Sequence, residues 1–186
     1  KSGGSSTPSA TPAGGAASST AVPTTRTAEP TAAPATPPDD VITPDASSID
    51  PKAAENGDLS KDEYPEVPLD KSVSIDGGII ISLGQPQAQD FASAPGEMGG
   101  AGLLVPVTVM NSSDQDIPLA SVLTTTVSYG DGIGTPASAV VSSSDAVPAK
   151  LAVGQQVTVN RAFVIPVEAR GNIKVAVDLG ADHSAA

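Results

Sequence analysis

The sequence predicts an all-β fold in which about seven short strands form two antiparallel sheets, preceded by a long disordered stalk. Three observations lead to this prediction. Residues 155–179 contain two runs of strict apolar alternation, which is the period of strands with one buried face. Turn-forming glycine, proline and aspartate recur at short intervals from residue 71 onward. Residues 1–70 lack apolar periodicity.

Residues 1–38 are expected to form the disordered stalk. They consist almost wholly of Ser, Thr, Ala, Pro and Gly, and only Lys1, Arg26 and Glu29 are charged. Such a segment cannot bury enough apolar surface to order itself, and its X-Pro pairs favour extended conformations. It would hold the folded domain away from a surface or serve as a flexible tail, and its Ser/Thr-Pro density also suits O-glycosylation.

Residues 39–70 are expected to form a second, acidic linker. Its ten Asp and Glu residues and two Lys residues give it a charge of −8 (2 − 10), out of a formal net charge of −12 for the whole chain. Repulsion among these charges extends the segment. It is either a solvated spacer or an acidic ligand for a basic partner or for divalent cations.

The folded domain is expected at residues 71–182, followed by a frayed tail at 183–186. Ser72–Ile75 and Ile79–Gln85 predict a hairpin, because Asp76-Gly77 favours a tight turn between apolar runs. This hairpin would open the first sheet of the domain.

The middle of the domain predicts further strands. Pro86–Gly102 is expected to be a long mobile connection, because glycine recurs in it. Residues 103–109 alternate as a strand, and Pro106 on its polar parity predicts a backbone position without a hydrogen-bond partner. Val122–Tyr129 predicts another core strand, and Val140-Val141 a short edge strand.

The two alternating runs near the C-terminus are expected to form an antiparallel hairpin. The apolar residues of 157–165 share one face, as do those of 173–179, and Pro166 and Gly171 interrupt the pairing between the two runs. This hairpin would close the domain.

Arg161 falls on the apolar face of the first of these runs. Its position indicates either a bulge or a place near a sheet edge where the long side chain reaches solvent. Alternatively, an exposed Arg161 forms part of a binding patch with Tyr129.

The number and spacing of these strands are typical of an immunoglobulin-like antiparallel β-sandwich. The cysteine and tryptophan residues of antibody domains are absent, so the pattern predicts the architecture alone. The buried side chains would be small aliphatic ones, because only 2% of the residues are aromatic. Modest stability is expected from such a core.

The stretches 103–130 and 151–179 resemble the Ig-like β-sandwich domains of exported and lipoprotein-type surface proteins of high-G+C Gram-positive bacteria. The shared features are a strand ending in Val-x-Val-x-Asn, an acidic Ser/Asp turn, and a Leu-x-x-Gly-Gln approach to a strand that ends at a proline. The resemblance covers residues 72–180 and fits the preceding stalk. The chain has no lipobox cysteine and no catalytic signature. The resemblance implies an extracellular binding or structural module and supplies no ligand.

Catalytic chemistry finds little support in the sequence. Without cysteine there is no disulfide, no thiolate nucleophile and no sulfur-ligated metal site. The single histidine, His183, lies in the expected tail, where a Ser-His-acid triad could not hold it in place. The chain has no phosphate-binding loop or nucleophile elbow. We expect no enzymatic activity and no cofactor.

A calcium site is the one metal site that the residues allow. The turn at 111–117 carries several side-chain oxygens, and a second glycine-rich loop carries another carboxylate. If the two loops met, the ligands would be Asn111, Asp114, Asp116 and Asp131. The alternative, which the residue pattern favours, is an Asx-turn whose side chains satisfy the backbone.

These observations predict a non-enzymatic Ig-like module, secreted or on the cell surface, that binds or builds part of an envelope or appendage assembly. Its partner would be a protein or cell-envelope component, or a second copy paired through an edge such as Val140-Val141. The charge of −12 argues against nucleic acid, and membrane contact would need an anchor upstream of Lys1. The alternative is a small secreted hydrolase or calcium-dependent module.

Overall fold

A computed structural model describes residues 25–34, 36–39, 41–42, 68–75, 78–132 and 134–180. Within these ranges the chain is mostly β, as predicted, and forms two sheets. The one α-helix there is the single turn α2 (Leu119–Val122), and two 3-10 turns, η2 (Val141–Ser143) and η3 (Val167–Ala169), accompany it. The expected tail with His183 and most of the expected stalk and linker lie outside the described residues.

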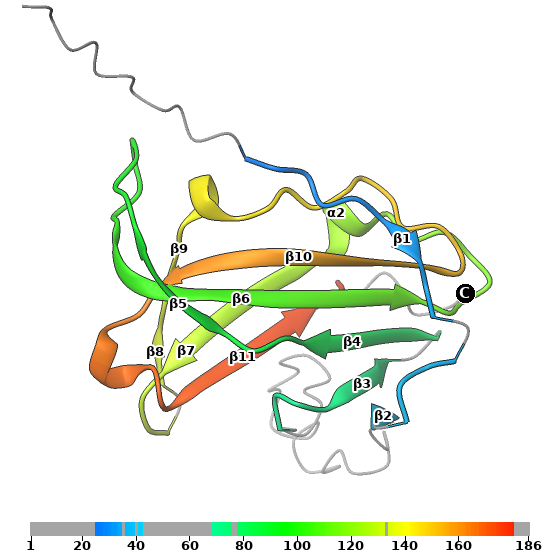
Figure 1. Cartoon of the computed structure of the whole chain (residues 1–186), viewed down its shortest axis with the longest axis horizontal. Coiled ribbons are helices and arrows are strands. Elements are labelled where there is room, and N and C mark those ends of the chain that lie inside the picture. Colours follow the sequence, from blue (N-terminus) through cyan, green and yellow to red (C-terminus); the bar gives the residue numbers. More distant parts are fainter. Residues whose placement is uncertain are drawn as a thin grey trace, which may run out of the picture.

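The larger sheet is built around two long strands that lie next to each other (Figure 1). Its order is β1-β10-β6-β4-β3-β2, and β5 and β9 pair with β6 and β10 respectively. The pairs are antiparallel except β2 with β3. The bounds are β1 Thr31–Ala32, β2 Val41–Ile42, β3 Ser72–Ile75, β4 Ile79–Leu83, β5 Gln87–Phe91, β6 Gly100–Asn111, β9 Ser138–Ala139 and β10 Gln155–Val164.

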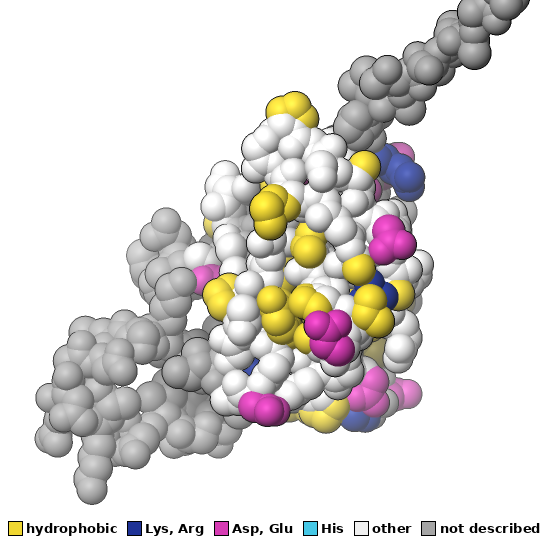
Figure 2. All heavy atoms as spheres, turned by 90° about the vertical axis from the view of Figure 1, so that its left-hand side faces the viewer, with side chains coloured by type: hydrophobic (Ala, Val, Ile, Leu, Met, Phe, Trp, Pro, Cys, Tyr) yellow, Lys and Arg dark blue, Asp and Glu magenta, His cyan; other side chains and the backbone are white. Residues whose placement is uncertain are grey.

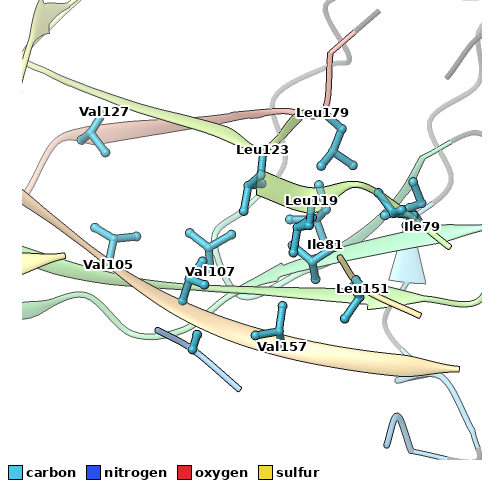
Figure 3. Packing of buried hydrophobic residues seen from close by; sticks show 14 of the residues in the cluster. Ile79, Ile81, Val105, Val107, Leu119, Leu123, Val127, Leu151, Val157 and Leu179 are labelled. Atoms are coloured by element: carbon cyan, nitrogen blue, oxygen red, sulfur yellow. The ribbon is translucent and has the colours of Figure 1, made fainter. Parts of the chain in front are cut away.

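The smaller sheet has the order β11-β7-β8 and is antiparallel. Its bounds are β7 Thr124–Tyr129, β8 Thr135–Pro136 and β11 Ile173–Asp178. Aliphatic side chains from both sheets and from α2 meet in one core (Figure 3). Val107 and Val159 of the larger sheet are fully buried, and Val127 of the smaller sheet is 3% exposed. The alternation in the sequence therefore assigned the buried faces correctly.

The predicted C-terminal hairpin is wrong, because its two strands lie in different sheets. β10 pairs with β6, and β11 pairs with β7. Pro166 and the 3-10 turn η3 carry the chain across the core between them. Adjacency in the sequence suggested the pairing, but β10 already has neighbours along both edges, so β11 must pair elsewhere.

The predicted mobile connection at Pro86–Gly102 is also wrong, because it contains β5, which pairs with the first half of β6. The first four residues of β5 are exposed, so the segment has no apolar periodicity to reveal it. Its glycines serve close packing rather than mobility: a Cβ on Gly102 would clash with the Phe163 carbonyl oxygen and the Phe91 ring. The Phe91 ring and the Phe163 backbone thus pack directly against the bare backbone at Gly102.

The predictions for β3 and Pro106 are confirmed, and β4 forms as predicted but ends at Leu83, two residues before the expected Gln85. β3 and β4 form the expected antiparallel pair, although the turn residues Asp76 and Gly77 lie outside the described residues. β4 ends at Leu83 opposite Val107, and β5 begins opposite Leu104. Pro106 therefore lies where β6 has a gap between two neighbours, and its carbonyl accepts a hydrogen bond from Gly84 N at 2.9 Å.

Part of the segment assigned to the stalk and linker belongs to the domain. β1 pairs with β10, and β2 pairs with β3. Ala28 is 7% exposed and joins the core, and its N–H donates to the Ala146 carbonyl at 3.1 Å. The boundary expected at residue 71 therefore differs from the structure, because these contacts come from backbone pairing of small residues that leaves no periodic pattern.

The strand expected at Val122–Tyr129 begins two residues later, since Val122 ends α2. The edge strand expected at Val140-Val141 is wrong. The strand in this region is β9, just before it, and Val140 is fully buried while Val141 begins η2. Val140 packs inward with Phe91 and Ala162, so it is not an apolar edge available to a partner.

Among the described residues, one buried side-chain hydroxyl in the core has no hydrogen bond. Thr125 is 8% exposed, and its Oγ1 has no partner among the described residues. Because a buried unsatisfied hydroxyl costs free energy, Thr125→Val is expected to raise the free energy of unfolding by about 1 kcal/mol. Thr126→Val, on the exposed face of the same strand, is the matched control. Urea titrations measure both, and equal effects would contradict the assignment of Thr125 to the core.

Candidate functional site

The expected calcium ligands do not come together. Asn111 ends β6 and Asp131 follows β7, at opposite ends of the molecule (Figure 1). Asp131 accepts a hydrogen bond from Asn172 Nδ2 at 3.0 Å, and Asp114 is exposed. Within the described residues, no three His, Cys, Asp or Glu side chains gather where they could hold a metal ion.

Asn111 instead organises the turn that follows β6. It is fully buried, and its Nδ2 donates to the carbonyl oxygens of Gln115 at 2.8 Å and Leu151 at 3.0 Å. Its Oδ1 accepts from Ser113 N at 3.0 Å and from Ser113 Oγ at 2.6 Å. This is the Asx-turn arrangement, in which a side chain satisfies the backbone.

The expected patch residues Tyr129 and Arg161 come from different sheets. Tyr129 is half-buried in β7 and packs against the core. The pairing of β10 with β6 is unbroken at Arg161, so there is no bulge, and Nη1 donates to the Asp145 carbonyl at 3.3 Å. Burial lowers the pKa of Arg161, and Asp145 opposes that shift. Arg161 therefore reaches the edge of its sheet, as one of the alternatives predicted.

Several carboxylates hold loops in place. Glu97, in the turn between β5 and β6, accepts hydrogen bonds from Val141 N at 2.9 Å and Ser142 Oγ at 2.6 Å. Asp116 pairs with Lys150 at 2.7 Å and accepts from Val153 N at 3.1 Å. Both carboxylates therefore stabilise the positions of loops within the protein.

These contacts predict acid sensitivity. Hydrogen bonds from the Ser142 side chain and backbone lower the pKa of Glu97 below 4.5, and Lys150 followed by Val153 N lowers that of Asp116 below 3.8. A carboxylate whose pKa is lower in the folded state stabilises the fold above its unfolded-state pKa, and the contribution disappears as the pH falls through the folded-state pKa.

The melting temperature should therefore fall as the pH drops below 4.5, and Glu97→Gln should flatten the profile between that pH and the lower folded-state pKa. Glu168→Gln, an exposed glutamate in η3, is the control and should leave the profile unchanged. Thermal melts across this range test the expectation. Equal profiles for Glu97→Gln and the unsubstituted protein would contradict the role of Glu97.

The outer edge of β10 is covered along most of its length. β9 pairs with its C-terminal end and β1 with its N-terminal end. Between them, side chains replace a strand: Ala162 N donates to Ser144 Oγ at 2.9 Å, and Asn160 N donates to Asp145 Oδ2 at 3.0 Å. Covering an edge in this way prevents pairing with other chains.

Within the described part of the chain, no strand covers the outer edge of β11. Gly130 N donates to the Asn172 carbonyl at 3.0 Å, and the direction of the N–H and C=O groups alternates from residue to residue along a strand. The N–H and C=O groups of the even-numbered residues of β11 therefore point toward β7. The N–H and C=O groups of Ile173, Val175 and Val177 point away from it. Among the described residues, no strand pairs with β11 on that side. Their side chains face the core but stay half-buried.

A groove of about 420 Å³ adjoins the start of this edge. It lies where β11 meets the break between β4 and β5, and its walls are mostly apolar. Arg170 lines it, and the Arg170 Nε is buried without a hydrogen-bond partner among the described residues. The lining residues are Leu69, Gln85, Pro86, Ala88, Leu103, Arg170, Gly171 and Ile173. Edge and groove together, which we call the β11 edge, form the candidate site.

The sequence identified the alternating aliphatic residues of β11 but neither the groove nor the role of the edge. Ile173, Val175 and Val177 were correctly assigned to the core face of a strand, but β10 was expected to cover its edge. One signal could have corrected this: the connection from Pro166 to Asn172 is longer than the two-residue turns that favour tight hairpins.

Comparisons of the chain with protein-family models, curated proteins and solved structures find no match.

In the described part of the chain, α2 and the 3-10 turns are far too short to cross a bilayer. Figure 2 shows the end of the molecule that carries the β5–β6 turn, where hydrophobic side chains are interspersed with Asp and Glu. Because the comparisons indicate no function, we infer the function from the β11 edge.

Proposed function

We propose that this chain is a non-enzymatic module with an immunoglobulin-like β-sandwich, secreted or on the cell surface. It acts by binding or as a structural part of an envelope or appendage assembly. The observation that carries the proposal is the β11 edge, because an open strand edge binds extended polypeptide through main-chain hydrogen bonds.

The strand order supports the immunoglobulin-like assignment. Such sandwiches place strands A, B, E and D in one sheet and C and F in the other, with G beside F and, in some, C′ beside C. Here β4, β6, β10 and β9 follow the first order, and β11, β7 and β8 follow F, C and C′. The β11 edge then corresponds to the position of strand G.

The use of the polar side chains supports a binding or structural role rather than catalysis. Glu97, Asp116, Asp131 and Asn111 each contact the protein's own backbone or side chains. A general acid or base needs a carboxylate that can reach a substrate in a cleft. Among the described residues, the groove beside β11 is lined mostly by apolar groups together with Gln85 and Arg170, and none of its lining residues is acidic.

The test uses the full chain in cells that produce it. External protease should remove the protein from intact cells, and a photo-cross-linking residue at Ala176, exposed on β11, should form adducts with an envelope component or a second copy. The same residue at Thr158, exposed on β10, is the control. Protection from external protease would refute the location, and equal adducts at both positions would refute the β11 edge as the binding site.

A further inference from the structure

We propose that the β11 edge binds the β11 edge of a second copy, so that two antiparallel β11 strands join two small sheets into one. The inference rests on the proposed function as a binding or structural module, and it names the partner. It replaces the pairing that the sequence suggested at Val140-Val141, because Val140 is buried and Val141 begins η2.

The backbone of β11 is complementary to itself. Its outward N–H and C=O groups belong to Ile173, Val175 and Val177. When two copies run antiparallel with Val175 opposite its counterpart, each Ile173 lies opposite the other copy's Val177. All three positions then exchange hydrogen bonds in both directions, about six bonds in total.

The side chains also fit this register. On the exposed face, Lys174 of one copy lies opposite Ala176 of the other, and its two diagonal neighbours are Asp178 and Lys174 of that copy. The register therefore places no like charges directly opposite each other. On the inner face, the aliphatic side chains of both strands continue the two cores.

The described part of the same chain offers no better strand as a partner. β6 has neighbours on both sides, and the edge of β10 is covered by β1, β9 and the side chains of Ser144 and Asp145. The other outer strands in the described part of the chain are β1, β2, β8 and β9, which are two residues long, and the five-residue β5, whose first four residues are exposed and carry no alternating aliphatic side chains. Among the described strands, only β11 combines length, alternating aliphatic side chains and an edge with no paired strand.

The test compares Val175→Pro with Val175→Ala in the full chain. The Val175 N–H points outward, so proline removes a donor from the edge without removing a bond to β7. Alanine removes nearly the same side-chain packing and keeps the donor. Sedimentation equilibrium between about 10 µM and 1 mM, where small interfaces dissociate, measures the mass.

The unsubstituted chain and Val175→Ala should approach twice the monomer mass at the upper concentrations, whereas Val175→Pro should remain a monomer with an unchanged circular dichroism spectrum. A monomeric unsubstituted chain, or a dimer of Val175→Pro, would overturn the proposal. If Val175→Pro does not fold, a mixture of the Ala176→Cys and Lys174→Cys variants provides the test, since the chain has no other cysteine. The two positions lie opposite each other in the proposed register, so disulfide dimers that join one variant to the other should exceed dimers of either variant with itself. Equal amounts of the three dimers would refute this register.

Failure here and failure of the proposed function are distinguishable. A chain that stays monomeric but still forms adducts at Ala176 with other envelope components would refute pairing with a second copy and leave the binding module in place. Absence of adducts on cells would refute the proposed function even if the purified protein dimerises.

Discussion

Val159→Asp is expected to leave the protein unfolded at room temperature. Val159 is fully buried in the core between the two sheets, and its neighbours there are aliphatic. A buried carboxylate without a partner costs several kcal/mol, which is most or all of the roughly 5–15 kcal/mol that stabilises a typical domain. Circular dichroism should show the loss of β structure.

Thr158→Asp is the matched control, since it introduces the same charge one residue earlier on the exposed face of β10. It removes one hydrogen bond, between the Thr158 and Thr108 hydroxyls at 2.7 Å, so a loss of about 1 kcal/mol or less is expected. Similar destabilisation by both substitutions would mean that the face of β10 is assigned wrongly.

Asn111→Ala is expected to have the second largest effect, about 3 kcal/mol or more. It removes the donors to the Gln115 and Leu151 carbonyls and the acceptor for Ser113, in a fully buried position. The Leu151 residue is itself fully buried, so water cannot replace the lost hydrogen bond at low cost.

Asp114→Ala, in the same turn but exposed, is the control and should change the free energy of unfolding little. Urea titrations of both variants separate a structural turn from a metal-binding loop. If calcium stabilised the protein and Asp114→Ala abolished that stabilisation, the turn would be a binding site rather than an Asx-turn.

The sequence predicted the faces of the strands well because that information is local. Val107, Val159 and Val127 lie in the core as their alternation indicated, and Pro106 lies at a gap in the sheet. Each of these follows from the two-residue period of a strand or from the missing N–H of proline. The two-residue period and the missing N–H of proline do not depend on which strands pair.

The pairing itself could not be predicted in the same way. The choice of β7 rather than β10 as the partner of β11 depends on long-range competition for strand edges, which periodicity does not record. The segment containing Ala28 was missed because alanine and threonine pair through the backbone without an apolar pattern. The β11 edge was missed for the same reason, since an open edge is defined by what pairs elsewhere.

Amide hydrogen exchange in β11, measured by nuclear magnetic resonance on dilute and concentrated full chain, tests the central claim most directly. In dilute solution the amides of Lys174 and Ala176, which face β7, should exchange slowly, while those of Ile173, Val175 and Val177 should exchange quickly. In concentrated solution the three odd-numbered amides should become protected as well. Protection of all five in dilute, monomeric protein would contradict an open β11 edge.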